Sequence, residues 1–327
     1  MLVPVLLFAL GLILLIKGGD WFVDGATGIA HRFHIPELLI GATVVSIGTT
    51  LPEVMVSASS ALGGHGEIAY GNAIGSIICN TSLIAAITIA VRPPKVEGKS
   101  LTIPVLFFFG AAAFYSCVAY FTGEFTRPVG IILLAIFAAY MLYNVLRVKN
   151  LPADAAEAEA DNDSDAKAEF ASPVRDVVKL VVGAAAIAWG ADLLVDNGTL
   201  IAQALGVPES VIALTFVALG TSLPELVTAV TSLVKGHGAL SLGNIIGANL
   251  FNLVLVSGVS VTLSPFAVPA SKLVAGMNAS LVVDIPLMLF VMAFLTLPGM
   301  IRGKLQRWQG VTLLTIYFAY IAFQFIG

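Results

Sequence analysis

The sequence predicts an all-α integral membrane protein with ten transmembrane helices, arranged as two inverted repeats of five helices. Three observations support this fold class. Only 11% of the 327 residues are charged and 58% are hydrophobic, whereas a soluble domain has roughly 25% charged residues. Ten apolar segments have about the 20 residues that a membrane-spanning helix needs. Finally, the second half of the chain repeats the first at an offset of 172 residues.

The apolar segments lack the alternating pattern of a β-barrel, so we interpret them as helices. The predicted spans are residues 2–20, 37–62, 67–90, 102–121, 128–147, 174–194, 208–233, 239–262, 284–301 and 308–326.

The basic residues of the predicted loops indicate the orientation of the spans. With both termini extracytoplasmic, thirteen Lys and Arg residues fall on the inner side and only two, Arg127 and Lys272, on the outer side. This bias follows the positive-inside rule. We therefore expect a multi-pass protein of the cell (plasma) membrane. A nucleic-acid partner is not expected, because 16 Lys and Arg against 20 Asp and Glu form no basic face.

An acidic, alanine-rich segment separates the two halves. Residues 150–172 contain almost no large apolar side chain, which is typical of a disordered linker. We predict a first repeat at residues 1–149, a cytoplasmic linker at 150–172 and a second repeat at 173–327.

The repeat is strongest around two short motifs. Of the 45 positions from 36 to 80, 19 are identical at the aligned positions 208–252. IGTTLPE (47–53) aligns with LGTSLPE (219–225), within repeat segments of about 36–83 and 208–255. Since five is an odd number of spans, the second copy must cross the membrane in the opposite sense. Inverted repeats are typical of secondary transporters, whose substrate site lies near the midplane.

The first motif places a proline and a glycine inside an apolar helix. Proline removes a backbone donor, which frees carbonyl groups one turn earlier, those of Gly48 and Thr49 and of Gly220 and Thr221. We expect a kinked or broken helix with carbonyls, hydroxyls and a carboxylate side by side. Such hard oxygen ligands suit Ca²⁺ or Na⁺.

Glu53 and Glu225 lie deep inside their spans, with no Lys or Arg at matching depth in any span. An ionised carboxylate there costs several kcal/mol unless it is paired or binds a cation. A bound cation explains both residues. The alternative is a protonated glutamate hydrogen-bonded between helices.

The facing helices are rich in glycine and amide side chains. Asn80 and Asn252 offer carbonyl oxygens, and Ser76 lies one turn before Asn80, where the second repeat has Ala248. Asn72 and Asn244 are interpreted as helix caps or interhelical contacts rather than ligands.

Other polar residues have simpler interpretations. Asp20, Asp24, Asp192 and Asp196 are interpreted as solvated or capping residues at the ends of their spans. The loop residue His237 is expected to be solvated.

The paired motifs resemble the two α-repeats of the calcium/cation antiporter superfamily, and most of all its prokaryotic sodium/calcium exchangers. The resemblance covers the whole chain. It implies a central Ca²⁺ site made of Glu53 and Glu225, the carbonyls of Thr49 and Thr221, and Asn80 and Asn252. It also implies flanking Na⁺ sites that include Thr50, Ser222, Ser76 and the carbonyls of Ser46 and Ala218. The first and sixth spans would slide as a gate.

The chain departs from the family pattern in four places. In the first repeat it has Gly75-Ser76-Ile77 where Gly-Ser-Asn is usual. Ala248 replaces a frequent serine, which removes a hydroxyl from one sodium site. Asn252 stands where potassium-dependent relatives have Asp, which argues against a potassium requirement. The proton/calcium branch has a Glu inside its helix with the Gly-Asn motif, whereas the corresponding stretch of this chain, GNAIGSIICN (71–80), has none, so Na⁺ is favoured over H⁺ as the driving ion.

We therefore predict a Na⁺/Ca²⁺ antiporter rather than an enzyme, functional as a monomer in the lipid bilayer. Ca²⁺ and Na⁺ would be transported substrates, with no organic cofactor. The alternatives are an H⁺/Ca²⁺ or other cation exchanger of the same superfamily and, from a different class, a cation channel. A membrane enzyme is disfavoured, since the sequence has no HExxH motif and no set of Ser, His and Asp typical of hydrolases.

Overall fold

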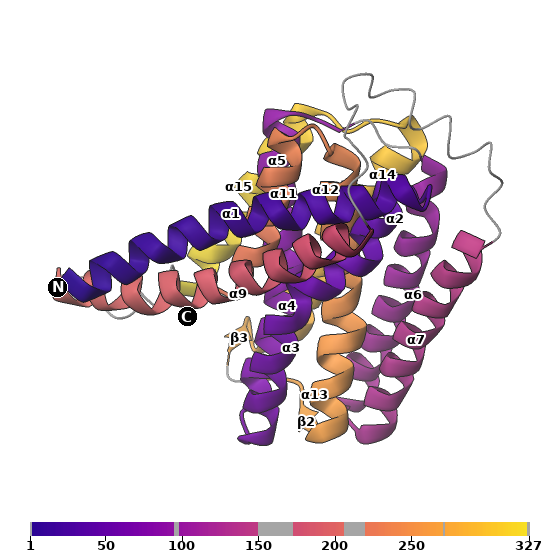
Figure 1. Cartoon of the computed structure of the whole chain (residues 1–327). Helices are drawn as coiled ribbons and strands as arrows, with labels where there is room; N and C mark the ends of the chain where they lie inside the picture. Colours follow the sequence, from indigo (N-terminus) through magenta and orange to yellow (C-terminus); the bar gives the residue numbers. More distant parts are fainter. Residues whose placement is uncertain (1, 95–97, 150–172, 206–219, 271, 326–327) are drawn as a thin grey trace.

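The protein is mostly helical, and long apolar helices make up the bulk of it (Figure 1). The computed structural model describes residues 2–94, 98–149, 173–205, 220–270 and 272–325. Within these residues, eight helices are long and apolar enough to cross a membrane. The predicted linker 150–172 and residues 208–219 of the seventh predicted span lie outside the described residues.

Both halves of the chain consist of helices with a few short strands between them. The first half contains α1 (Leu2–Arg32), α2 (Glu37–Ile40), η1 (Gly41–Val45), α3 (Ser46–Leu62), α4 (Gly66–Cys79), η2 (Asn80–Ala85), α5 (Ala86–Val91), α6 (Gly98–Thr122), β1 (Glu124–Phe125) and α7 (Arg127–Lys149). The second half contains α9 (Pro173–Ala204), α11 (Leu223–Val234), α12 (Gly238–Phe251), η4 (Asn252–Val256), α13 (Ser257–Leu263), β2 (Phe266–Ala267), β3 (Leu273–Val274), β4 (Met277–Asn278), η5 (Ser280–Asp284), α14 (Ile285–Arg302) and α15 (Arg307–Phe325).

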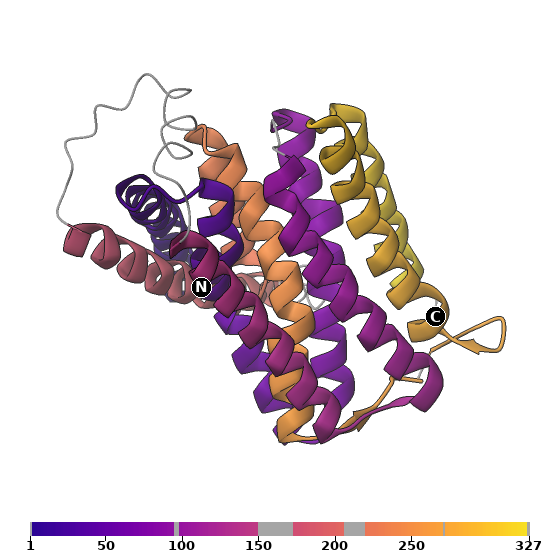
Figure 2. The ribbon, with the colours of Figure 1, turned by 90° about the vertical axis from the view of Figure 1, so that its right-hand side faces the viewer.

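Helices α1 and α9 are much longer than predicted. The sequence predicts spans at 2–20 and 174–194, but the helices contain 31 and 32 residues. Both run obliquely across the other helices and lie together at one edge of the molecule, opposite α14 and α15 (Figures 1 and 2). The prediction ended the first span at its first acidic residue, but the helix continues because its aspartates form ion pairs with other helices.

Glycines allow α1 and α9 to pack closely in an antiparallel pair. Gly11, Gly18 and Gly25 are spaced seven residues apart on α1 and face the backbone of α9. A Cβ atom on Gly25 would lie 2.5 Å from the backbone nitrogen of Leu180. Small residues permit this close backbone contact between helices in a bilayer.

The spans that carry the repeated motifs are irregular. A π-helical turn, η1, separates α2 from α3, another, η2, separates α4 from α5, and η4 separates α12 from α13. Turns η2 and η4 begin at Asn80 and Asn252, which are aligned in the repeat. Single π-helical turns inside α-helices occur frequently at functional sites.

Several of the described connections between helices lie together at two ends of the molecule. At one end, β1 pairs with β2 in antiparallel register, and Gly66 packs against Phe266. At the other end, Gly238 packs against Pro94. Arg92 and Lys235, which were predicted to lie on the inner side, belong to this second end. We call it the basic end.

Replacing Gly25 with alanine should destabilise the protein by about 1–3 kcal/mol, because the new methyl group would overlap the backbone of α9. Thermal unfolding of the purified protein in detergent measures this change. The matched control is Gly110→Ala on α6, where no atom lies within 4 Å of the added Cβ. An equal effect of the two substitutions would contradict close packing at Gly25.

Candidate functional site

One face of α3 is polar and fully buried. Glu53 and Thr50 are 0% exposed and Thr49 is 2% exposed, whereas Leu51 and Met55 on the opposite side are exposed. The buried residues follow the helical spacing of three and four positions. The helix therefore turns its polar face inward and its apolar face outward, as expected for a span around an intramembrane polar site.

The first motif does not break its helix, which corrects one of the two expectations for this segment. Helix α3 runs through Pro52 to Leu62, and the irregular turn of this span is η1, which ends just before Ser46. Because Pro52 has no N–H group, the carbonyl of Gly48 still lacks its helical donor.

The second motif is different, because its helix begins inside it. Residues 220–222 form a turn, and α11 starts at Leu223 with a proline in its first positions. Glu225 therefore lies in the first turn of a helix, where backbone N–H groups and the helix dipole favour a negative charge. Glu53 has no such position in α3.

Two hydrogen bonds join the halves of the chain in a symmetric way. The Thr49 hydroxyl donates to Asn244 Oδ1 over 3.2 Å, and the Thr221 hydroxyl donates to Asn72 Oδ1 over 3.3 Å. The four residues form two aligned pairs of the repeat. Asn72 and Asn244 thus act as interhelical contacts, one of the two roles that the sequence suggested for them. They do not cap helices, because α4 and α12 begin six residues earlier.

Asn72 also fixes the α3 segment next to Glu53. Its side-chain nitrogen donates to the Glu53 carbonyl over 3.2 Å and to the Ser57 hydroxyl over 2.8 Å. The backbone near the first carboxylate is therefore held from both halves of the chain, since Asn72 itself accepts from Thr221.

Many of the predicted ligand atoms are buried without a hydrogen-bond partner. They are the carboxylate oxygens of Glu53 and Glu225, the hydroxyls of Thr50 and Ser222, and both polar side-chain atoms of Asn80 and Asn252. The buried residues of the described chain include no lysine or arginine. Buried polar groups are normally hydrogen-bonded, so unpartnered atoms on so many of the predicted ligands are the pattern expected where a polar or charged ligand binds.

The remaining predicted residues occupy different surroundings. Ser76 is 5% exposed on α4, one turn before Asn80, and its repeat partner Ala248 is fully buried. Ser46 is buried, and its hydroxyl lies 2.7 Å from the Gly41 carbonyl and 2.9 Å from the Asn244 carbonyl. Ala218 lies outside the described residues.

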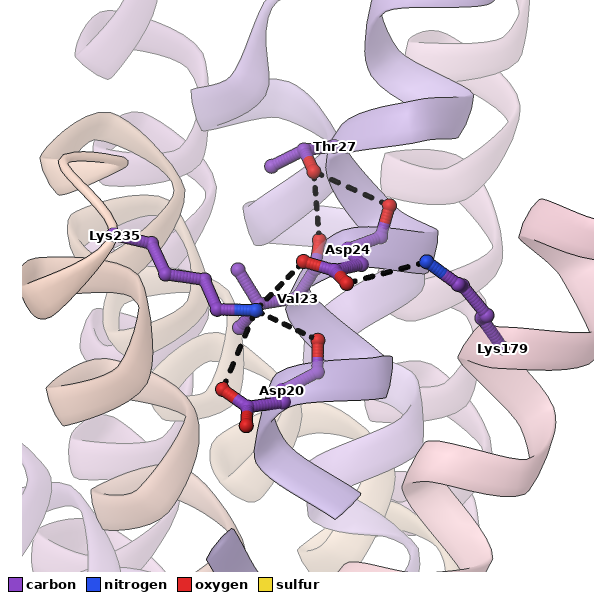
Figure 3. Close-up of polar contacts among 6 residues, drawn as sticks. All are labelled: Asp20, Val23, Asp24, Thr27, Lys179 and Lys235. Atoms are coloured by element: carbon purple, nitrogen blue, oxygen red, sulfur yellow. Dashed lines mark hydrogen bonds and ion pairs between the residues drawn. The ribbon is translucent and has the colours of Figure 1, made fainter. Parts of the chain in front are cut away.

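Acidic residues of α1 form ion pairs that were not predicted from the sequence (Figure 3). The Lys235 amino group lies 2.6 Å from Asp24 Oδ1 and 3.3 Å from Asp20 Oδ1. Lys179 of α9 lies 3.2 Å from Asp24 Oδ2. Both aspartates are partly exposed, but they connect α1 to α9 and to the end of α11, which a solvated or capping role does not predict.

Further polar contacts lie at the same end. Arg32 at the end of α1 pairs with Asp176 of α9 at 3.2 Å. His237 Nδ1 lies 2.7 Å from Glu37 Oε1, and both side chains are mostly buried. The expectation that His237 is solvated was therefore wrong, because the short connection before α12 packs against the start of α2.

Three buried hydroxyls beyond Glu225 were also not predicted from the sequence. They belong to Thr228, Ser232 and Ser241, and they have no hydrogen-bond partner among the described residues. The spacing of Glu225, Thr228 and Ser232 on one helix face was a signal that could have revealed them.

Comparison with known families gives this site a context. The profile described as "Sodium/calcium exchanger protein" matches residues 3–146 and 176–326. The chain belongs to the sodium/calcium exchanger family. An uncharacterized membrane protein of Methanocaldococcus jannaschii is 35% identical over 96% of each chain. The sodium/calcium exchanger MaX1 of Methanosarcina acetivorans is 29% identical over 98% of each chain.

The fold also agrees with a solved exchanger structure. The sodium-calcium exchanger NCX_Mj, soaked with 2.5 mM Na⁺ and 10 mM Sr²⁺, superposes with a TM-score of 0.79. It is 31% identical to this family member, with 98% of each chain covered. The likeness extends over both halves, including the helices that carry the candidate site.

The ion pair between Asp24 and Lys235 predicts an energetic coupling in this exchanger-family chain. In a double-mutant cycle of Asp24→Asn and Lys235→Met, the coupling energy should be about 1 kcal/mol. Thermal or denaturant unfolding at low ionic strength measures it, and added salt should reduce it because the pair is partly exposed.

The control cycle pairs Asp24→Asn with Lys17→Met, since Lys17 is an exposed lysine on the same helix. A coupling as large in the control as with Lys235 would show that the pair in Figure 3 does not join α1 to α11 in solution.

Proposed function

We propose that the protein is a secondary active antiporter that exchanges Na⁺ for Ca²⁺ across the membrane. The observation that carries the proposal is the pair of fully buried carboxylates, Glu53 and Glu225, without hydrogen-bond partners, together with buried neutral oxygen atoms from both halves that also lack partners. A cation supplies the charge that the buried residues of the described chain do not. The names of MaX1 and NCX_Mj indicate sodium and calcium as the ions.

The proposed ligands divide into a central site and flanking sites. Glu53 and Glu225 with the carbonyls of Thr49 and Thr221 bind Ca²⁺ at the centre, and Asn80 and Asn252 complete it. Thr50, Ser222, Ser76, Ser46 and Ala218 line the flanking Na⁺ sites. The hydroxyls of Thr49 and Thr221 already bond to Asn244 and Asn72, which leaves their carbonyls as the ligands.

Charge balance makes the two ions compete. Two carboxylates are neutralised by one Ca²⁺ or by two Na⁺, and both loads together would leave excess positive charge in a region of low dielectric. Exchange requires a site that binds either Ca²⁺ or Na⁺ but not both at once. A channel would instead conduct each ion down its own gradient.

The architecture we propose is ten transmembrane helices in two inverted repeats, residues 1–149 and 173–327, joined by a cytoplasmic linker at 150–172. The match of the family profile to two segments on either side of this linker supports the division. The crossed threonine–asparagine bonds support a site at the junction of the repeats. Both termini face outward from the plasma membrane, with the basic end in the cytoplasm.

Transport proceeds by alternating access, in which α1 and α9 slide together over the other helices. The length, oblique course and mutual packing of these two helices support their motion as a pair (Figures 1 and 2). Lys235 belongs to the end of α11, so a slide of α1 must break its contacts with Asp20 and Asp24 (Figure 3).

Neutralising either carboxylate should abolish exchange. Glu53→Gln and Glu225→Gln keep the shape but remove one of the two charges that balance Ca²⁺, so Na⁺-driven ⁴⁵Ca²⁺ uptake into proteoliposomes should fall to background. Glu124→Gln, at an exposed glutamate of β1, is the control and should transport normally. Full uptake in both site variants would refute the assignment.

The driving ion is tested by imposing Na⁺, H⁺ or K⁺ gradients on the same proteoliposomes. Uptake of ⁴⁵Ca²⁺ should follow the Na⁺ gradient alone. Uptake driven by a pH gradient without Na⁺ would identify a proton/calcium exchanger instead, and a conductance that needs no counter-ion would identify a channel.

A further inference from the structure

Three hydroxyl groups lie between Glu225 and the basic end of the molecule. Thr228 and Ser232 belong to α11 and are 0% exposed, and Ser241 belongs to α12 and is 2% exposed. None of the three hydroxyl oxygens has a hydrogen-bond partner in the described part of the chain. None of these residues belongs to the ligand set proposed above.

Several other buried hydroxyls of the protein are satisfied within their own helices, although those of Thr50, Ser222 and Thr262 are not. Thr81 donates to the Ile77 carbonyl over 2.7 Å, and Thr296 donates to the Met292 carbonyl over 2.7 Å. Such back-bonding is the usual arrangement for threonine and serine in a helix. Thr228, Ser232 and Ser241 depart from it together, so their oxygens are available to another polar group.

The three side chains follow a direction from the carboxylate towards the surface. Glu225, Thr228 and Ser232 are spaced three and four residues apart and share one face of α11. Helices α11 and α12 are joined by a short connection, and they pack against each other. Ser232 lies three residues before Lys235 and Ser241 three residues after Gly238, which places them at the same height of this hairpin.

An indentation of the surface lies where this line of hydroxyls ends. The indentation is shallow and narrow, and Ser241 is one of its lining residues, with Thr88, Pro94, Leu233, Gly238 and Leu242. The connection that carries Lys235 and His237 begins beside it, so the indentation belongs to the basic end.

The other repeat differs at the aligned positions. The residues aligned with Thr228, Ser232 and Ser241 are Val56, Ser60 and Ala69. Only one of the three hydroxyls has a counterpart at the aligned position. Ser57 lies on the same face of α3 as Glu53, but its hydroxyl accepts a hydrogen bond from Asn72 over 2.8 Å. Among these serines and threonines, Thr228, Ser232 and Ser241 are the ones that are buried and unpartnered.

We propose that Thr228, Ser232 and Ser241 line the path by which a Na⁺ or Ca²⁺ ion passes between Glu225 and the basic end. This inference rests on the proposed exchange function. The hydroxyl oxygens replace water around the ion as it loses its hydration shell. Because they are neutral, they bind the ion weakly enough for it to move on, as conduction through a narrow path requires.

The first experiment separates passage from binding. In the triple variant Thr228→Val, Ser232→Ala and Ser241→Ala, Na⁺-driven ⁴⁵Ca²⁺ uptake should fall about tenfold or more, which corresponds to a barrier raised by about 1.4 kcal/mol. Equilibrium Ca²⁺ binding to the detergent-solubilised protein should stay within about twofold of the unmodified protein. Thr296→Val, at a hydroxyl bonded within its own helix, should leave both unchanged.

Two results would overturn the inference. Unchanged uptake by the triple variant would show that the hydroxyls are not needed for passage. A parallel loss of uptake and of equilibrium binding would make them part of the central site instead. Thermal unfolding of the same samples confirms that the variant is folded, and the single variants replace it if it is not.

The second experiment does not depend on which ion is transported. Ser232→Cys is introduced after Cys79 and Cys117 are replaced with alanine, and a membrane-impermeant thiol reagent is applied from either side of sealed vesicles during turnover. Labelling should occur only from the side that also labels Lys304→Cys. Lys304 is exposed in the connection before α15, which lies at the basic end because Gly310 of α15 packs against Ala90 of α5, next to Arg92. Thr296→Cys should remain unlabelled.

Failure of the proposed exchange function and failure of the proposed ion path give different results. If the protein transports no Ca²⁺, the proposed function fails, but labelling of Ser232→Cys still shows an aqueous path at this position. If transport is normal and Ser232→Cys is never labelled, the path is wrong while the function stands.

Discussion

The structure depends on one electrostatic constraint, which is that two carboxylates are buried in a membrane protein without a cationic side chain among the buried residues described. A carboxylate in such surroundings is stabilised by a ligand of opposite sign, and without one it takes up a proton. In an ordinary protein interior, polar side chains would form hydrogen bonds with Glu53 and Glu225. Here the side chains of Asn72 and Asn244 bond instead to threonines of the other half of the chain. The protein therefore keeps its hydrogen-bonded framework separate from the oxygens that remain available.

The two carboxylates are related by the repeat but do not have equal surroundings. Helix α3 continues through the first motif, so Glu53 lies in a helix interior. Helix α11 begins inside the second motif, so Glu225 lies in a first turn and benefits from the helix dipole. A negative charge is therefore better stabilised at Glu225 than at Glu53. An approximate symmetry of sequence thus produces a site with two chemically different sides.

Much of the candidate site could be predicted because the membrane makes polar residues conspicuous. Glu53 and Glu225 were found from their depth in apolar spans, and the repeat then pointed to Asn80 and Asn252. The lengths of α1 and α9 could not be predicted in this way. In the sequence, Asp20 and Asp24 indicate the end of a span. In the structure they form ion pairs with lysines that are distant in the chain: Lys179 and Lys235 lie 155 and 211 residues after Asp24. Likewise, the rule that proline kinks or breaks a helix considers only the local sequence. Helix α3 continues through Pro52, so the surrounding packing decides the outcome there.

The π-helical turns at Asn80 and Asn252 show how far the likeness of the two halves extends. Both turns begin at the same aligned position, and the two copies match without a gap up to this point. A π-helical turn changes the backbone hydrogen bonding from the α-helical pattern. Each half of the chain therefore carries the same irregularity at the same position, so the repeat is present in the backbone hydrogen bonding as well as in the sequence.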